Sequence, residues 1–251
     1  MESVWLFVAL GAALAGFVQG LSGFAFGMVS MSVWIWVLEP QVAATLAVFG
    51  ALVGQLVAAF SVRRGFDLRM LLPFVAGGLV GIPLGVALLP RLNMDVFRAL
   101  LGALLVLWCP AMLMSSRLPR LKAGNRLADG LVGMLGGIMG GLGGFTGTLP
   151  TLWCTLCGYE RDRQRAIIQN FNLSMLAVTM LTYLGTGLVT RDVLPLFAIV
   201  APAMLIPTFL GTRMYLGISD LRFRQIVLGL LTASGVILLA SSVPKLISIY
   251  F

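Results

Sequence analysis

Residues 130–150 read GLVGMLGGIMGGLGGFTGTLP, and this stretch decides the fold that we expect. Nearly half of its residues are glycine, although its other side chains are as apolar as those of a membrane helix. A glycine in the interior of a helix costs about 1 kcal/mol relative to alanine. Such a density of glycine therefore indicates closely packed backbones, a broken helix, or a ligand that approaches bare backbone.

The same glycine spacing occurs near the N-terminus. Four glycines recur after a shift of 120 positions, namely Gly16, Gly20, Gly23 and Gly27 as Gly136, Gly140, Gly143 and Gly147. Later blocks also match, for example Ile82-Pro83 with Ile206-Pro207. We interpret the pattern as an internal duplication within one transmembrane domain, with repeat A at residues 1–126 and repeat B at residues 127–251.

The composition indicates that the bilayer is the solvent of this chain. Of its 251 residues, 59% are hydrophobic and 10% are charged, and the mean hydropathy is +1.02. These polar groups are too few to cover a soluble globule. The net charge of +8 sits in short loops between apolar spans, which is typical of cytoplasmic loops facing anionic lipid rather than of nucleic-acid binding. We therefore expect an all-α integral membrane protein with about eight membrane helical elements.

Two apolar segments are too long for one membrane helix and barely long enough for two. They are residues 4–38, which the sequence QGLSG at 19–23 interrupts, and residues 127–157, which contain the glycine-rich stretch. We expect each segment to form a broken or re-entrant pair of helices. If each pair is counted as two elements, the number of membrane helical elements is larger than eight. The remaining spans are expected at residues 42–62, 70–89, 99–114, 166–184, 193–212 and 225–243.

The Lys and Arg residues favour one of two topologies. If each glycine-rich segment crosses the membrane once, the 17 basic residues divide nine to eight between the two sides. If each segment enters and returns, four lie outside and thirteen lie inside, in loops 63–69, 117–126, 161–165 and 213–224. The positive-inside rule favours the second arrangement, in which the repeats are inverted and both termini lie outside.

A chain reversal at membrane depth leaves peptide groups unpaired, so both reversals must be shielded by protein or line a wet cavity. The second helix of each pair is expected to start near Phe24 or Phe145, with Ser22 or Thr146 as its cap, and its N-terminus carries a partial positive charge. Two such ends that converge near the middle of the membrane form an anion site. The residues expected to bind the anion expose N–H groups or add donors, namely Gln19, Ser22, Gly23, Gly27, Gly140, Gly143, Gly144, Thr146, Gly147 and Thr148.

Two further candidates for substrate binding are Gln169 and Asn170, which fall within the first two turns of a later span. Amides are costly in hydrocarbon unless they are paired, so these side chains are expected either to line the route of the anion or to bond neighbouring helices. For the glycines, the alternative is that they serve only close helix packing.

Enzyme chemistry lacks its usual groups in this sequence. The GLSG at residues 20–23 matches a motif of intramembrane serine proteases, but the chain has no histidine to act as the base. Cys154 and Cys157 have no second pair with which to complete a metal site, so neither metal nor cofactor is expected. All nine acidic residues fall in loops or at the ends of spans, which leaves no intramembrane acid to relay protons or hold sodium.

Four blocks of the sequence carry a resemblance to a known family. They are GFVQGLSGFAFG (16–27), GLVGMLGGIMGGLGGFTG (130–147), IPLG with LNMDVFRALLG (82–102), and IPTFLG with ISDLRFRQIVLG (206–229). Over essentially its whole length the chain resembles the sulfite exporter TauE/SafE family of membrane permeases. The resemblance implies transport of sulfite, sulfonates and related sulfur-containing anions across the bacterial inner membrane. Phe24, Ala25 and Phe26 occupy positions where glycines are common in that family, which shifts the expected anion site toward residues 140–148.

The direction of transport can be argued from the membrane potential. An anion that leaves a cell with a negative interior gains about 2.3 kcal/mol per charge per 100 mV, so export is the simplest hypothesis. Coupled uptake of an organic anion and an anion channel stay open as alternatives. The expected partners are a small anionic substrate and the lipid bilayer, without nucleic acid, and a homo-oligomer is left open.

Overall fold

The computed structural model describes residues 2–23, 25–61, 67–115, 125–214 and 220–250. These residues form ten α-helices and two short 3-10 helices, without a strand among them. The helices are α1 (Glu2–Ser22), α2 (Phe26–Trp34), α3 (Pro40–Ser61), α4 (Leu68–Leu88), η1 (Leu89–Arg91), α5 (Met94–Leu113), α6 (Arg126–Gly143), α7 (Thr148–Leu156), α8 (Arg161–Thr186), η2 (Arg191–Val193), α9 (Leu194–Met214) and α10 (Asp220–Tyr250). In each half, the second α-helix is only nine residues long.

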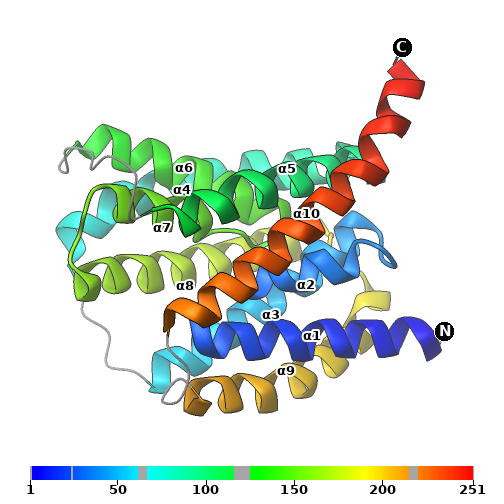
Figure 1. The fold of residues 1–251 in the computed structure, drawn as a ribbon, viewed down its shortest axis with the longest axis horizontal. Helices are drawn as coiled ribbons and strands as arrows, with labels where there is room; N and C mark the ends of the chain where they lie inside the picture. The colour runs from blue at the N-terminus through cyan, green and yellow to red at the C-terminus, as the bar shows by residue number, and fades with distance from the viewer. Residues whose placement is uncertain (1, 24, 62–66, 116–124, 215–219, 251) are drawn as a thin grey trace.

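Seven of the described helices are long and apolar enough to cross a membrane, namely α1, α3, α4, α5, α8, α9 and α10. The prediction of an all-α integral membrane protein is therefore confirmed. Most of the long helices run along one direction, and α10 crosses them obliquely (Figure 1). The spans of α3 and α8 are the most buried, with 56% and 50% of their residues inside the molecule, so these two helices form its centre.

The long arms of the two glycine-rich segments pack on helices of the opposite half. Helix α1 lies along α9, where the Thr208 hydroxyl donates to the carbonyl of Gly16 at 3.0 Å. Helix α6 lies along α4, and a Cβ added to Gly137 would meet the Cα of Gly78 at 2.9 Å. Contacts this close need glycine on both helices, because any side chain would separate the two backbones. The two halves are thus interlocked by reciprocal contacts.

Helices α5 and α10, the last helix of each half, cross at a pair of glycines. A Cβ added to Gly102 would lie 2.9 Å from the carbonyl oxygen of Gly235, and one added to Gly235 would lie 2.9 Å from that of Gly102. The same contact is thus made in both directions.

Three helices extend beyond the spans expected from hydropathy. Helix α5 begins at Met94 because Asn93 Oδ1 caps it by accepting the N–H of Val96 at 2.8 Å. Helix α10 continues to Tyr250, and α8 already begins at Arg161. Both helices include charged residues, which a prediction from hydropathy leaves outside the span. As a consequence, residues 169 and 170 lie in the third turn of α8 and not in its first two turns.

The two termini lie at the same end of the molecule, whereas the first residues of α6 and α8 lie at the opposite end (Figure 1). At the end with the termini, Asp95 lies 3.9 Å from Arg98 and 3.8 Å from Lys245. Most of the basic loops at 63–69, 117–126 and 213–224 lie outside the described residues.

Candidate functional site

The break between α6 and α7 starts with a glycine in the left-handed conformation. Gly144 has a φ of +77°, and its N–H donates to the carbonyl of Gly140 at 2.8 Å. The N–H of Phe145 donates to the carbonyl of Met139 at 3.3 Å, as in a Schellman motif. These bonds satisfy the last carbonyls of α6, so the helix ends inside an apolar segment.

Aromatic side chains from α5 and α8 hold both sides of this break. Trp108 of α5 donates from Nε1 to the carbonyl of Thr148 at 2.7 Å, and the hydroxyl of Tyr183 of α8 donates to the carbonyl of Gly141 at 2.8 Å. Both bonds are buried, and each adds a partner to a backbone carbonyl beside the break. The end of α6 and the start of α7 are therefore fixed by separate partners.

Helix α8 also fixes the two residues that precede α7. The Thr146 hydroxyl donates to Asn172 Oδ1 at 2.9 Å, and a Cβ added to Gly147 would lie 2.7 Å from the amide group of Asn172. Because its hydroxyl is engaged in this way, Thr146 does not cap α7. The prediction of a cap by Thr146 and of a helix start near Phe145 is wrong: α7 begins at Thr148, without a side-chain cap.

The break between α1 and α2 contains a glycine of the same conformation. Gly23 has a φ of +83°, and its N–H donates to the carbonyl of Gln19 at 2.7 Å. Its own carbonyl accepts a bond from Gln55 Nε2 of α3 at 2.7 Å, and Gln19 Nε2 donates to the carbonyl of Ala51 at 3.3 Å. Amide side chains therefore hold this break against α3.

Ser22 acts within this turn and not at the start of the next helix. Its Oγ accepts the N–H of Ala25 at 3.3 Å, whereas α2 begins at Phe26 without a side-chain cap. The expected capping of the second helix by Ser22 is therefore not seen. Phe24, near which that helix was expected to start, lies outside the described residues.

The two breaks pack directly against each other. A Cβ added to Gly27 at the start of α2 would lie 3.1 Å from the carbonyl oxygens of both Gly143 and Gly144. A Cβ on Gly144 would in turn lie 3.4 Å from Val48 of α3. Val48 follows the first residue of α3, Pro40, by eight positions in a 22-residue helix, so the junction of the breaks lies beside the interior of α3 and not at either end.

The glycines of α6 lie on two faces with different neighbours. Gly133, Gly137 and Gly141 approach the backbone of α4, as close helix packing requires. Gly136 and Gly140 instead face the turn before α7, where a Cβ on Gly136 would lie 2.9 Å from the carbonyl oxygen of Thr146. Helix packing therefore accounts for the first face only.

Three backbone N–H groups at the start of α7 have no hydrogen-bond acceptor among the residues that the structure describes. They belong to Thr146, Gly147 and Leu149, whereas the N–H of Thr148 donates to the carbonyl of Phe145 at 3.2 Å. Thr146 is only 1% exposed, and Gly147 is buried as well. Buried N–H groups without a partner are rare in proteins, and here they lie at the positive end of a helix.

Two buried side-chain atoms near the junction also have no partner in the described structure. Gln19 Oε1 is one, since the amide nitrogen of Gln19 bonds to Ala51, and Thr179 Oγ1 on α8 is the other. Thr179 is fully buried, and its Oγ1 lies 3.7 Å from the position of a Cβ on Gly140. Polar groups left without a partner in this way mark a place where a ligand can supply the missing bonds.

The sequence model of the sulfite exporter TauE/SafE family matches residues 8–238. The chain belongs to this family. No curated protein and no solved structure matches the chain. Membership of a transporter family, together with the seven membrane-length helices, makes this TauE/SafE protein a multi-pass membrane transporter, consistent with the inner-membrane location expected from its sequence.

Most of the substrate-binding residues expected from the sequence lie at the two breaks of this TauE/SafE protein. They are Gln19, Ser22, Gly23 and Gly27 at the first break, and Gly140, Gly143, Gly144, Thr146, Gly147 and Thr148 at the second. The side-chain donors among them are already engaged within the protein, since the hydroxyl of Thr148 also donates to the carbonyl of Phe145 at 2.8 Å. Backbone N–H groups are therefore the donors that stay available to a ligand.

Gln169 and Asn170 lie in the third turn of α8. Gln169 is 8% exposed, and Asn170 Nδ2 donates to the carbonyl of Ala166 within α8 at 2.9 Å. Asn172, a polar residue in the middle of a span, makes the contact with the break instead. The sequence carries no signal for Trp108, Tyr183 or Thr179, because an aromatic or threonine residue in an apolar span is common.

One acidic side chain is buried, although the sequence indicated no acid inside the membrane region. Asp129 in the first turn of α6 is 6% exposed, and its Oδ1 accepts a bond from Trp153 Nε1 of α7 at 2.7 Å. Burial and, secondarily, the Asp129 carboxylate raise the pKa of Tyr159 to about 12, so this phenol stays protonated near neutral pH. The carboxylate does lie at the end of a helix as expected, but the returning α7 covers it.

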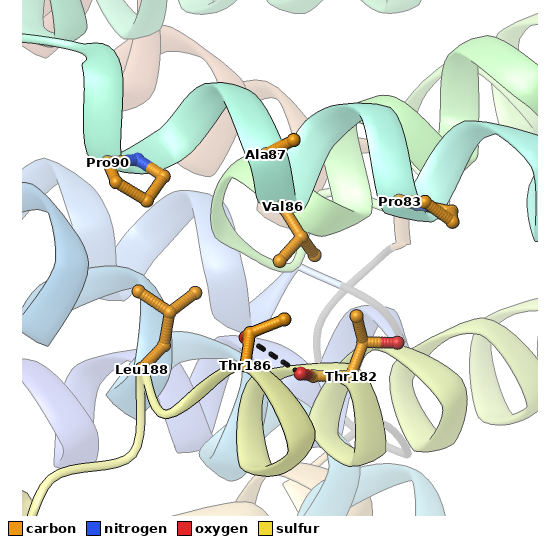
Figure 2. A pocket seen from close by; sticks show the side chains of 7 residues that line it. All are labelled: Pro83, Val86, Ala87, Pro90, Thr182, Thr186 and Leu188. Carbon is orange, nitrogen blue, oxygen red and sulfur yellow. Dashed lines mark hydrogen bonds between the residues drawn. The ribbon is translucent and has the colours of Figure 1, made fainter.

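A pocket of about 250 Å³ between α4 and α8 is separate from the junction (Figure 2). Its lining residues are Pro83, Val86, Ala87, Pro90, Thr182, Thr186 and Leu188. The two threonine hydroxyls donate to carbonyls of their own helix, Thr182 to Val178 and Thr186 to Thr182, each at 2.8 Å. The pocket therefore offers an anion little beyond apolar surface.

Proposed function

We propose that this protein exports small sulfur-containing oxyanions, such as sulfite and organosulfonates, and binds the anion at the start of α7. The observation that carries the proposal is that the N–H groups of Thr146, Gly147 and Leu149 have no acceptor among the described residues, and that Thr146 and Gly147 are buried. N–H groups at a helix N-terminus bind oxyanions through hydrogen bonds and the helix dipole. The first break, with Gly23 and Gly27, would complete the site from the opposite side.

We further propose that the two halves, residues 1–126 and 127–251, are inverted repeats that move against each other during transport. The reciprocal packing of α1 on α9 and of α6 on α4 supports this relation. In the present structure Gly27 packs on the carbonyls of Gly143 and Gly144. The anion would reach the N–H groups when the two breaks part, which is the motion that alternating access requires.

The test of this proposal is anion efflux from proteoliposomes whose membrane potential is clamped at several values. Sulfite is compared with sulfate and with methanesulfonate. Saturable efflux of sulfite that increases with an inside-negative potential is expected, because each charge gains about 2.3 kcal/mol per 100 mV. Efflux that does not saturate would indicate a channel, and the absence of any anion flux under every condition would reject the function.

The buried carboxylate of Asp129 favours proton-coupled uptake as a second candidate function. A buried acid in a transporter is a common proton carrier, and this one is held only by the indole of Trp153 among the bonds described. If coupling occurs at Asp129, the Asp129→Asn variant should lose the flux that a proton gradient drives. Exchange of sulfite with equal pH on both sides of the membrane should be unchanged. Unchanged proton-driven flux in this variant would exclude Asp129 as the carrier.

A further inference from the structure

The hydroxyl of Thr179 on α8 differs from the hydroxyls of most other threonines in the helices. A threonine inside a helix commonly donates to the carbonyl four residues earlier, which satisfies the hydroxyl within its own helix. Among the described residues, this bond is made by Thr45, Thr155, Thr182, Thr186, Thr208 and Thr232. Thr179 is fully buried, yet its Oγ1 has no partner in the part of the chain that the structure describes, and Thr151 on α7 is the other buried threonine of this kind there. The Thr179 hydroxyl therefore forgoes a bond that its own helix offers.

Thr179 lies on the face of α8 that holds the α6–α7 break. Asn172, two turns earlier, accepts the hydroxyl of Thr146 at 2.9 Å. Tyr183, one turn later, donates to the carbonyl of Gly141 at 2.8 Å. Residues that are four or seven positions apart share one face of a helix. Thr179 therefore faces the break from a position between two side chains that bond to it.

The break places a glycine opposite this hydroxyl. A Cβ added to Gly140 would lie 3.7 Å from Thr179 Oγ1 and 2.5 Å from Thr146 Cγ2, so both threonine side chains border the same glycine. Thr146 is also the first of the three residues before and in α7 whose N–H groups have no acceptor among the described residues. The Thr179 hydroxyl therefore lies beside the turn that leads into α7, and it is a side-chain donor independent of the backbone donors there.

We propose that Thr179 is a substrate-contacting residue, whose hydroxyl donates to an oxygen of the anion bound at the start of α7. This inference rests on the proposed function and adds a side chain to a site otherwise built from backbone N–H groups. A buried hydroxyl without a partner lowers the stability of the empty protein, and an oxygen of the anion supplies the missing bond. Binding sites commonly sacrifice stability in this way in order to keep a group free for a ligand.

The experiment measures the KM and the maximal rate of sulfite efflux from proteoliposomes, together with thermal unfolding in detergent. Thr179→Val keeps the shape of the side chain and removes the hydroxyl. The KM should rise about 10- to 100-fold, as for the loss of a hydrogen bond to a charged group, while the maximal rate stays similar. The unfolding temperature should stay the same or rise, because no bond within the protein is lost. Thr179→Ser, which keeps the hydroxyl, should restore most of the affinity.

Thr182→Val is the matched control on the same helix, and it should leave the KM unchanged. The Thr182 hydroxyl donates to the carbonyl of Val178 at 2.8 Å, and its side chain lines the separate pocket in Figure 2.

Each other result decides against the role of Thr179 or against the function. An unchanged KM in Thr179→Val, an equal rise in Thr182→Val, or a Thr179→Ser variant as weak as Thr179→Val overturns the inference and leaves the proposed function. A lower unfolding temperature or a failure to fold in Thr179→Val also overturns it, because the hydroxyl then has a partner within the protein. Absence of sulfite efflux from the unmodified protein rejects the proposed function itself.

Discussion

At the α1–α2 break the side chains that hold the chain are amides, whereas at the α6–α7 break they are an indole, a phenol and a hydroxyl. Gln55 Nε2 bonds to the carbonyl of Gly23, and Trp108 Nε1 bonds to that of Thr148. Among the described side chains, the first break also leaves the buried acceptor Gln19 Oε1 without a partner. The comparison teaches that two breaks of similar backbone shape can be held in place by different side-chain chemistry.

The largest effect is expected from closing the space between the breaks. Gly27→Leu would place a side chain against the carbonyls of Gly143 and Gly144, which a Cβ at position 27 already approaches to 3.1 Å. Because the two breaks would be forced apart, sulfite efflux should fall by about 100-fold or more. Gly229→Leu serves as the control, since nothing lies within 4 Å of its Cβ. Normal efflux with Gly27→Leu would show that the breaks need not touch during transport.

The next effect tests which break binds the anion. Asn172→Asp keeps the size of the side chain that contacts Thr146 and Gly147 but adds a negative charge. Two like charges about 6 Å apart repel by about 3 kcal/mol at an effective dielectric constant of 20, so the KM for sulfite should rise about 100-fold. Gln55→Glu, the matching change at the first break, should lower thermal stability more than it changes KM. Equal changes of KM in the two variants would contradict the assignment of the anion to α7.

A smaller effect is expected when α7 loses one of its supports. Trp108→Phe removes the buried bond to the carbonyl of Thr148, at a cost of about 0.5–1.5 kcal/mol. Sulfite transport at low concentration should then fall about tenfold, because the N–H groups of α7 are less well placed. Trp34→Phe removes a similar indole bond, to the carbonyl of Val8, far from α7 in the sequence. It should lower stability alone, and a matching loss of transport would mean that Trp108 has no special role.

The smallest effect on transport is expected on the face of α6 that packs against α4. A Cβ on Gly133 would lie 2.7 Å from the backbone carbon atoms of Phe74, so Gly133→Ala should destabilise the protein by about 1–3 kcal/mol. The KM for sulfite should not change, since this face does not reach the break. Gly130→Ala is the control, with its nearest neighbour at 3.6 Å, and it should unfold in detergent at the original temperature or slightly above. A changed KM in Gly133→Ala would mean that both faces of α6 serve the site.

Hydropathy and glycine spacing were sufficient to predict the all-helical membrane fold and to indicate the segments in which α1 and α6 end. Hydropathy and glycine spacing are local properties of the sequence. The length of an apolar segment determines whether it can span the membrane, and a glycine in the left-handed conformation, such as Gly144, can end a helix. The family was also readable from the sequence, since the family that the glycine-rich blocks resemble is the one whose model matches residues 8–238.

The partners of individual side chains could not be read from the sequence. Thr146 has the position and chemistry of a helix cap, yet Asn172, which lies 26 residues further on, accepts its hydroxyl. Asp129 lies at the end of a helix, where solvent would be expected, but Trp153 returns to cover it. Such pairings depend on how the helices pack, and no local pattern specifies them.

The bond between Thr208 and Gly16 joins residues that are 192 positions apart, and this has a consequence for synthesis in the cell. At about 5–20 residues per second, the ribosome needs roughly 10–40 s after making α1 before α9 exists. Until then the glycine face of α1 has no helix to pack on, so the first half cannot reach its final structure while the chain grows. A nascent chain stalled before α9 should therefore be degraded as a misfolded product, although all of its own spans have been made.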